Sequence, residues 1–239
     1  MIPIGTILTP FKEKFGVPRQ SLMIPEAKGV IKLRPHPDFQ LAVEELDSFS
    51  HIWLIFLFDR HEATEWRPLI EPPRTEVQNR VGVFASRSPH RPNPVGLSVV
   101  KLESIDKNRA DGIEIHISGV DILNETPLLD MKPYLPYADS IPQASSGWAR
   151  EEIQKFKVTF SPESLVDLKM ARNLPPDFLV LATRMLELDP RPTSQRKQHP
   201  IGHNQSENRP YAFRILDFDI KWKIQNGGLY VCRILSLNG

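Results

Sequence analysis

The chain has almost no cysteine. Its 239 residues include one, Cys232, which excludes an internal disulfide framework and a multi-cysteine metal site. Cys232 lies in an apolar run, where a packed thiol is the simplest interpretation. His199 and His203 are four residues apart, but Pro200 and Gly202 disfavour the helix that would aim both imidazoles at one metal. We therefore predict no metal site.

Long apolar runs and a secretion signal are also missing. The longest apolar run, 52–58, is far shorter than the roughly 18 residues that a membrane-spanning helix needs. The first residues lack a basic region followed by an apolar stretch. The net charge is only +1, so any contact with nucleic acid must come from a local basic patch. These absences predict a cytoplasmic protein that does not contact a membrane.

Two nucleotide-binding motifs are absent as well. No Gly-x-Gly-x-x-Gly follows a strand pattern, and no Gly-x-x-x-x-Gly-Lys-Ser/Thr occurs, which disfavours a Rossmann domain and a P-loop. The chain instead has 23 prolines, roughly twice the average usage of about 5%. Their even spread favours a loop-rich, mainly β fold over a helical bundle.

Strand patterns dominate residues 1–145. Short β-branched or alternating runs are bounded by Pro, Gly, Asn and Asp, as expected for strands and turns. One segment, 38–46, has helical spacing after Pro37. A nearly continuous apolar run, 51–58, predicts a strand at a buried central position. The remaining predicted strands are 2–9, 29–33, 81–85, 97–105, 112–122 and 127–131, with a turn at 106–111 between two of them.

A small-residue linker at 144–147 separates these strands from a second pattern, at 150–239, which predicts a small α+β domain. After a strand at 156–160, Ser161 is a suitable helix N-cap and Pro162 suits the first helical position. A second helix is expected after Asp177, with an apolar face made of Phe178, Leu181, Met185 and Leu188. Two final strand runs, 211–223 and 229–237, flank Asn226-Gly227-Gly228, a strong hairpin pattern.

The loop from Arg87 to Pro94, Arg-Ser-Pro-His-Arg-Pro-Asn-Pro, is the most informative stretch of the chain. Three prolines fix the backbone and remove three donors, so the loop can be neither a helix nor a central strand. A stiff loop that presents two arginines and a histidine suits a site for an anionic or polar ligand. The alternative is a proline-rich surface turn with solvated arginines.

Three other segments combine charge with a stiff backbone. Residues 15–20 form a Gly- and Pro-containing loop after the first strand, and Asp59 and Arg60 end the buried strand. In the segment 130–139, Asp130 and Lys132 point to one side of an extended chain. That pair is either one wall of a polar pocket or an exposed ion pair worth only about 0–1 kcal/mol.

These four segments, in this order and spacing, resemble the TsaA-like family. The resemblance covers roughly residues 1–145, and the second domain, with Asp189-Pro-Arg-Pro192, resembles the extension of the family's bacterial members. It implies a single-sheet β-barrel methyltransferase domain at 1–145 that binds S-adenosylmethionine without Rossmann glycines. It also implies a homodimer with the cofactor pocket near the subunit interface, and a C-terminal domain at 150–239 that contacts tRNA.

The activity implied is methylation of N6 of threonylcarbamoyladenosine at position 37 of tRNA, next to the anticodon. The alternative within the same fold is a non-catalytic module that binds S-adenosylmethionine or RNA. A hydrolase is disfavoured because no nucleophile, base and orienting group are recognisable. Carried over motif by motif, the predicted cofactor contacts are Pro18, Arg19, Gln20, Asp59, Arg60, Arg87, Leu97, Asp130, Met131, Lys132 and Pro133.

The roles of other polar residues stay open at this point. The acceptor nitrogen is a weak nucleophile, so a nearby group that takes its proton would help. Asp130, Tyr134 and Asp139 are the candidates. Arg191–Arg209 is either a mobile solvated loop or a phosphate clamp. The predicted RNA contacts are His90, Arg91, Arg191, Arg196, Lys197 and Arg209.

Overall fold

The computed structural model describes residues 1–60, 66–73, 79–110, 112–149 and 153–237. The chain forms two compact units, of which the first comprises Met1–Pro10 and Arg19–Arg150 and the second Phe11–Pro18 and Glu151–Gly239. The loop 11–18 was expected in the first domain. It belongs to the second unit because Phe11 is buried and Gly16, at φ 96°, lies against Phe213 so closely that a Cβ would be 3.0 Å from its ring.

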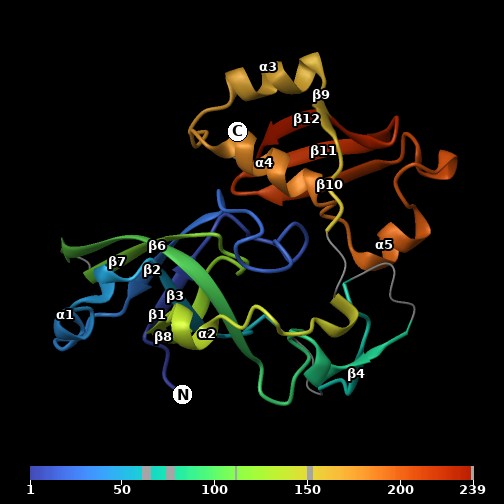
Figure 1. Cartoon of the computed structure of the whole chain (residues 1–239). Coiled ribbons are helices and arrows are strands. Elements are labelled where there is room, and N and C mark those ends of the chain that lie inside the picture. The colour runs from blue at the N-terminus through green and yellow to red at the C-terminus, as the bar shows by residue number, and fades with distance from the viewer. Residues whose placement is uncertain (61–65, 74–78, 111, 150–152, 238–239) are drawn as a thin grey trace. The chain divides into compact units, whose positions relative to one another are not determined.

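The first unit is a closed barrel of six antiparallel strands (Figure 1). In barrel order these are β1 (Gly5–Leu8), β2 (Lys28–Leu33), β7 (Gly112–Ser118), β6 (Val95–Arg109), β3 (His51–Leu57) and β8 (Thr126–Pro133), and β8 closes on β1. Closure leaves no sheet edge open in the barrel. The predicted single-sheet β-barrel is confirmed.

Strand β3 lies between β6 and β8 in the barrel. Ile52, Leu54 and Phe56 fill the interior with exposed fractions of 4% or less. The alternate residues, including Trp53 and Ile55, are half-buried on the outer face. A continuous apolar run had predicted burial on both faces, and the structure corrects this: the outer face is apolar but partly open.

Smaller differences concern the connections. The run 81–85 is not one strand: β5 (Val81–Gly82) pairs with β4 (Leu69–Ile70), and residues 83–85 form a 3-10 turn. The helix expected at 38–46 is reduced to α1 (Phe39–Ala42), because Glu45 adopts a left-handed conformation at φ 60° that a helix cannot contain. The turn expected at 106–111 falls mostly within β6, and its residue 111 lies outside the described residues. A short helix, α2 (Pro136–Asp139), follows β8.

Among its described residues the second unit has a four-stranded sheet and three α-helices, of which α3 and α4 lie against the sheet (Figure 1). The sheet order is β10 (Pro210–Ile215), β11 (Phe218–Gln225), β12 (Gly228–Ser236) and β9 (Val158–Phe160), with β9 parallel to β12. The helices are α3 (Pro162–Met170), α4 (Phe178–Glu187) and α5 (Thr193–Gln198). Asn226 and Gly227 both have positive φ, as a two-residue type I′ hairpin turn requires, so the predicted hairpin is confirmed. The run 211–223 is two strands, turned at Leu216.

Local sequence explains both longer helices. The Ser161 hydroxyl accepts a hydrogen bond from the Ser164 backbone N–H at 3.0 Å, which caps α3 as predicted. Asp167 of α3 accepts two bonds from the Arg233 guanidinium, at 2.7 and 3.0 Å, and so anchors this helix to β12. The apolar face of α4 is buried as expected at Phe178, Leu181 and Met185. Across the described part of the chain, no helix is long and apolar enough to cross a bilayer.

Candidate functional site

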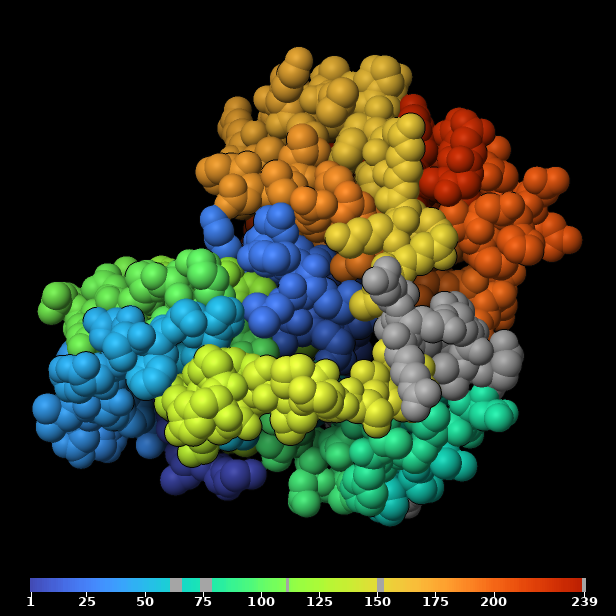
Figure 2. Space-filling model, in the orientation of Figure 1, coloured from blue at the N-terminus to red at the C-terminus, as the bar shows by residue number. Residues whose placement is uncertain are grey.

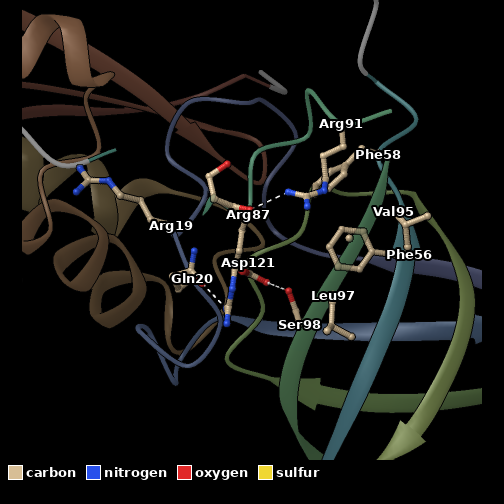
Figure 3. A pocket seen from close by; sticks show the side chains of 12 residues that line it. Arg19, Gln20, Phe56, Phe58, Arg87, Arg91, Val95, Leu97, Ser98 and Asp121 are labelled. Atoms are coloured by element: carbon tan, nitrogen blue, oxygen red, sulfur yellow. Dashed lines mark hydrogen bonds between the residues drawn. The ribbon is translucent and has the colours of Figure 1, made fainter. Parts of the chain in front are cut away.

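A cavity of about 330 Å³ opens in the first unit at one end of the strands β3 and β6 (Figure 3). Three segments that are distant in sequence meet there: the loop at 19–20, the end of β3, and the proline-rich loop with the start of β6 that follows it. A fourth contribution comes from the residues after β7. The lining consists of Arg19, Gln20, Phe56, Phe58, Ser86, Arg87, Arg91, Val95, Gly96, Leu97, Ser98 and Asp121.

The proline-rich loop holds its shape through Arg91. The Arg91 guanidinium donates to the carbonyl oxygens of Val83 at 3.0 Å and Ser86 at 2.7 Å. It thus ties the loop to the turn before it. The sequence predicts an RNA contact for Arg91. In the structure its Nη1 is already hydrogen-bonded to the turn before the loop. His90, the other residue of this loop with a predicted RNA contact, is half-buried.

Arg87 connects two of the predicted segments. Its Nη1 donates to the Gln20 side-chain oxygen at 2.5 Å, and Figure 3 shows the two side chains meeting at the edge of the cavity. One N–H of the guanidinium is used there, so other donors of this exposed side chain remain to face a ligand. Arg19 and Arg91 also line the cavity, so the site has three arginines beside an apolar wall, of which Arg91 is bonded to the turn 83–86.

Asp121 is a site residue that sequence reasoning missed. Its carboxylate accepts from the Ser98 hydroxyl at 2.7 Å and from the backbone N–H of Ser21. Burial raises the pKa of Asp121, while the Ser98 bond and the nearby Arg87 charge oppose the rise. The sequence gives one indication that Asp121 is unusual, because it is an acidic residue within the otherwise apolar stretch 119–123.

The floor of the cavity is formed by aromatic rings, because β6 has a glycine, without a side chain, at the position that faces them. Gly96 lies opposite Phe56 in the register of β6 and β3, and a Cβ at this glycine would collide with the Phe56 ring. The Phe56 and Phe58 rings meet edge to face, with centroids 5.3 Å apart. Glycine is therefore required here by close approach rather than by backbone conformation.

Strand register brings another predicted segment to the same place. Ile55 pairs with Leu97 on one side and with Asp130 on the other, so these three side chains share the outer face of the barrel. The next outer row consists of Val99, Trp53 and Lys132. Leu97 is 54% exposed and also lines the cavity, so it joins the cavity to this outer face.

On that face the Asp130 carboxylate accepts from the Met131 backbone N–H at 2.9 Å and lies 3.0 Å from the Lys132 ammonium. Both side chains are about half exposed, so this pair is an exposed ion pair that also stays open to a ligand. Pro133, the last residue of β8, pairs with Ile52. The sequence allowed two interpretations of the segment 130–139, an exposed ion pair or one wall of a polar pocket. The structure is compatible with both, because Asp130 and Lys132 pair with each other and stay accessible.

Other predicted cofactor residues lie outside the cavity lining. Arg60 donates to the Asn124 carbonyl oxygen at 2.7 Å and lies 3.4 Å from the Glu125 carboxylate. Asp59 is exposed next to it, and its backbone N–H is bonded to the Leu57 carbonyl oxygen. Pro18 is buried and belongs to the loop assigned to the second unit.

The three candidate proton acceptors differ in their surroundings. The Asp139 carboxylate accepts from Trp53 Nε1 at 3.1 Å and from the Leu135 backbone N–H at 2.8 Å. Asp139 thereby holds α2, and we assign it to structure. Tyr134 lies beside Trp53, with ring centroids 5.8 Å apart, and Asp130 faces the open outer face. Residues 136–147 are exposed, and Figure 2 shows this segment at the surface of the unit.

The basic segment of the second unit is partly built into its fold. Arg191 lies 2.7 Å from Asp189, with side-chain exposures of 2% and 5%, and stacks over Tyr211 at 4.9 Å. The Arg191 guanidinium is thus largely engaged within the unit, by Asp189, Tyr211 and the His199 carbonyl oxygen, and its RNA contact stays a prediction. Arg196 and Lys197 lie in α5, so the segment is not structureless, and Arg209 is exposed.

Comparisons with known proteins agree with this architecture. The family model for the tRNA-methyltransferase O N-terminal domain matches residues 6–140, and the model for the TrmO C-terminal domain matches residues 153–237. The first covers more than half of the chain, and together they span both units. The chain belongs to the TrmO family of tRNA methyltransferases, whose cofactor is S-adenosylmethionine.

Individual relatives extend the match over nearly the whole chain. The tRNA (adenine(37)-N6)-methyltransferase of Escherichia coli (strain K12) is 35% identical over 95% of this chain and 94% of its own. A Pseudomonas aeruginosa protein named "Putative S-adenosylmethionine-dependent methyltransferase RcsF" is 37% identical over 99% and 96%. The crystal structure of TrmO from P. aeruginosa superposes with a TM-score of 0.76 at 34% identity, covering 98% and 95%.

The half-buried carboxyl group gives a prediction about pH. Because the pKa of Asp121 is raised in the folded state, ionisation of this group costs stability. That stability is fully present below the unfolded pKa of about 3.9 and is lost as pH rises through the folded pKa. Urea unfolding of wild type and Asp121→Asn should therefore show wild type gaining stability relative to the variant as pH is lowered from about 7 to 4.

The matched control is Asp217→Asn, whose carboxylate forms an ion pair with Lys12 at side-chain exposures of 45% and 47%. An exposed pair of this kind changes the unfolding free energy by less than about 1 kcal/mol. A pH-independent difference between wild type and Asp121→Asn would contradict a half-buried, proton-linked carboxyl group at this position.

Proposed function

We propose that this protein transfers a methyl group from S-adenosylmethionine to N6 of threonylcarbamoyladenosine at position 37 of tRNA, beside the anticodon. The observation that carries the proposal is the convergence of Arg19, Gln20, Arg87 and Leu97 on one cavity in a chain that matches both TrmO domains. The names of its relatives support tRNA adenine N6 as the acceptor. The threonylcarbamoyl group on the substrate adenosine is proposed because the sequence motifs resemble those of the TsaA-like family.

The residues at the cavity fit S-adenosylmethionine. A volume of about 330 Å³ lies within the roughly 300–1,000 Å³ typical of small-molecule sites. Arg87 and Arg19 offer cations to the carboxylate of the cofactor, and Asp130 on the adjoining outer face offers an anion to its amino group. Phe56 and Phe58 supply the apolar surface that a purine requires.

The cofactor supplies an electrophilic methyl group that needs no acid activation. The protein's task is to position the acceptor nitrogen in line with it, and positioning of this kind contributes a large share of the barrier reduction. That nitrogen is weakly basic because a carbonyl and a purine are attached to it. Asp130, in the same outer row as Leu97, would take its proton directly. Tyr134 lies two rows along, beside Trp53, and could take the proton only as a phenolate.

The outer face beside the cavity supports a homodimer. Trp53, Ile55, Leu97 and Val99 form a half-buried apolar surface across β3 and β6, and surfaces of this kind mark association sites. A second copy of the chain would cover this surface and enclose a cofactor that contacts Leu97 and Asp130. The dimer would thus complete the site.

Association has a direct test. Val99→Asp places a charge on the outer face without entering the barrel core, so we expect a dimer in wild type and a monomer in the variant by sedimentation velocity. Leu41→Asp, at a residue of α1 that is 73% exposed, is the control and should remain dimeric. A monomeric wild-type protein, or a dimeric Val99→Asp, would contradict the assignment of this face.

Cofactor binding tests the assignment of the cavity. We expect saturable binding of S-adenosylmethionine to wild type by calorimetry and at least a tenfold weaker affinity for Arg87→Ala, because a charge-assisted bond is worth about 1.5–3 kcal/mol. Arg34→Ala, an exposed arginine of the same unit that does not line the cavity, should bind like wild type. If Arg87→Ala bound S-adenosylmethionine as tightly as Arg34→Ala, the assignment of the cofactor to this cavity would be wrong.

The acceptor has its own test. With labelled S-adenosylmethionine, tRNA that carries the threonylcarbamoyl group should be methylated, and mass spectrometry of its nucleosides should place the label on adenosine 37. Transcripts without the modification should accept none. Methylation of unmodified adenosine would be consistent with methyl transfer to adenine N6. It would contradict the proposal that the substrate must carry the threonylcarbamoyl group.

A further inference from the structure

We infer that Trp66 and Phe84 form a stacking platform for an unpaired base of the tRNA, beside the cofactor cavity. The inference rests on the proposed function and names a contact for its RNA substrate. Neither aromatic residue belongs to the cofactor or RNA contacts expected from the sequence.

The two rings form an exposed stacked pair. Their centroids lie 6.4 Å apart and their planes are inclined by 18°. Trp66 is 48% exposed and Phe84 is 73% exposed. Large aromatic side chains usually bury most of their surface, so two adjacent rings that stay open indicate a surface that contacts another molecule.

Backbone pairing fixes the pair in place. Trp66 precedes β4 and Phe84 follows β5, and these two strands pair through Leu69 with Gly82 and Ile70 with Val81. The Val83 backbone N–H bonds to the Pro68 carbonyl oxygen at 2.9 Å. Phe84 itself lies within the 3-10 turn 83–85. A platform held by short paired strands loses little entropy on binding.

Arg91 joins the platform to the cofactor cavity. Its guanidinium carbon lies 5.7 Å from the centroid of the Phe84 ring, and the same side chain lines the cavity. One guanidinium therefore separates the aromatic pair from the place proposed for the methyl donor. A base that neighbours the methylated adenosine would be within reach of the platform when the adenosine is at the cavity.

The charge around the pair favours RNA as the occupant. The described residues of the segment 66–91 include four arginines and one glutamate, although the whole chain has a net charge of only +1. Arg67 and Arg80 are exposed. Exposed aromatic rings among arginines match the recognition of unpaired bases, which stack on aromatic faces while cations neutralise the phosphates.

Steady-state kinetics with modified tRNA tests the platform. Phe84→Ala and Trp66→Ala should each raise KM for tRNA by about 5- to 100-fold, in line with the loss of one stacked base. Affinity for S-adenosylmethionine and kcat at saturating tRNA should stay near the wild-type values. Phe84→Tyr, which keeps the ring, should restore KM. Leu41→Ala, with the same 73% exposure on α1, should have no effect.

Trp66 also provides an optical readout. Binding of tRNA should quench tryptophan fluorescence in wild type, and the quench should fall in Trp66→Phe. An unchanged KM for tRNA in Phe84→Ala, with active wild-type enzyme, would overturn the platform. So would a change of oligomeric state in that variant, because the pair would then belong to an interface between copies. Inactive wild-type enzyme would instead contradict the proposed function.

Discussion

The register of β3 between β6 and β8 is the constraint on which the candidate site depends. It places Leu97, Ile55 and Asp130 in one row on the outer face of the barrel. A shift of one residue in either pairing would turn Leu97 or Asp130 toward the interior. Closure of the six strands opposes such a shift, because the interior positions are filled by side chains such as Ile52, Leu54 and Phe56. The packing of the barrel thus determines which residues meet a ligand.

At one end of the same strands, a half-buried carboxylate joins the loops. Asp121 accepts from Ser98 and from the backbone of Ser21, next to the Gln20 side chain that receives Arg87. The proline-rich loop is stiffened by its prolines and by Arg91. Arg87 is thereby presented on a preorganised frame, with Arg19 lining the same cavity, which reduces the entropy lost when an anionic group binds. The same frame positions Phe84 on its other side.

Local patterns predicted the strands of the first unit, the Ser161 cap of α3 and the Asn226-Gly227 hairpin. The barrel, and the grouping of residues 19–20 with Arg87, came from the resemblance of motifs with fixed spacing to a known family. The sequence did not predict that Asp121 would enter the site, because that depends on where a strand ends in three dimensions. It did not predict that Arg191 pairs with Asp189 inside the second unit, since a charge in a polar segment says nothing about burial. The loop 11–18 was misassigned for a similar reason: contiguity in sequence does not determine which unit a loop packs against.

The central claim is that S-adenosylmethionine binds at the cavity between the proline-rich loop and the loop at 19–20, and extends over Leu97 toward Asp130 on the outer face of the barrel. Hydrogen–deuterium exchange of the protein with and without S-adenosylmethionine tests this claim most directly. We predict that the cofactor slows exchange in three separate peptides, covering residues 19–22, 86–97 and 130–134, and leaves the rates in β10–β12 unchanged. Slower exchange confined to the second unit, or in none of these three peptides at saturating cofactor, would contradict the account.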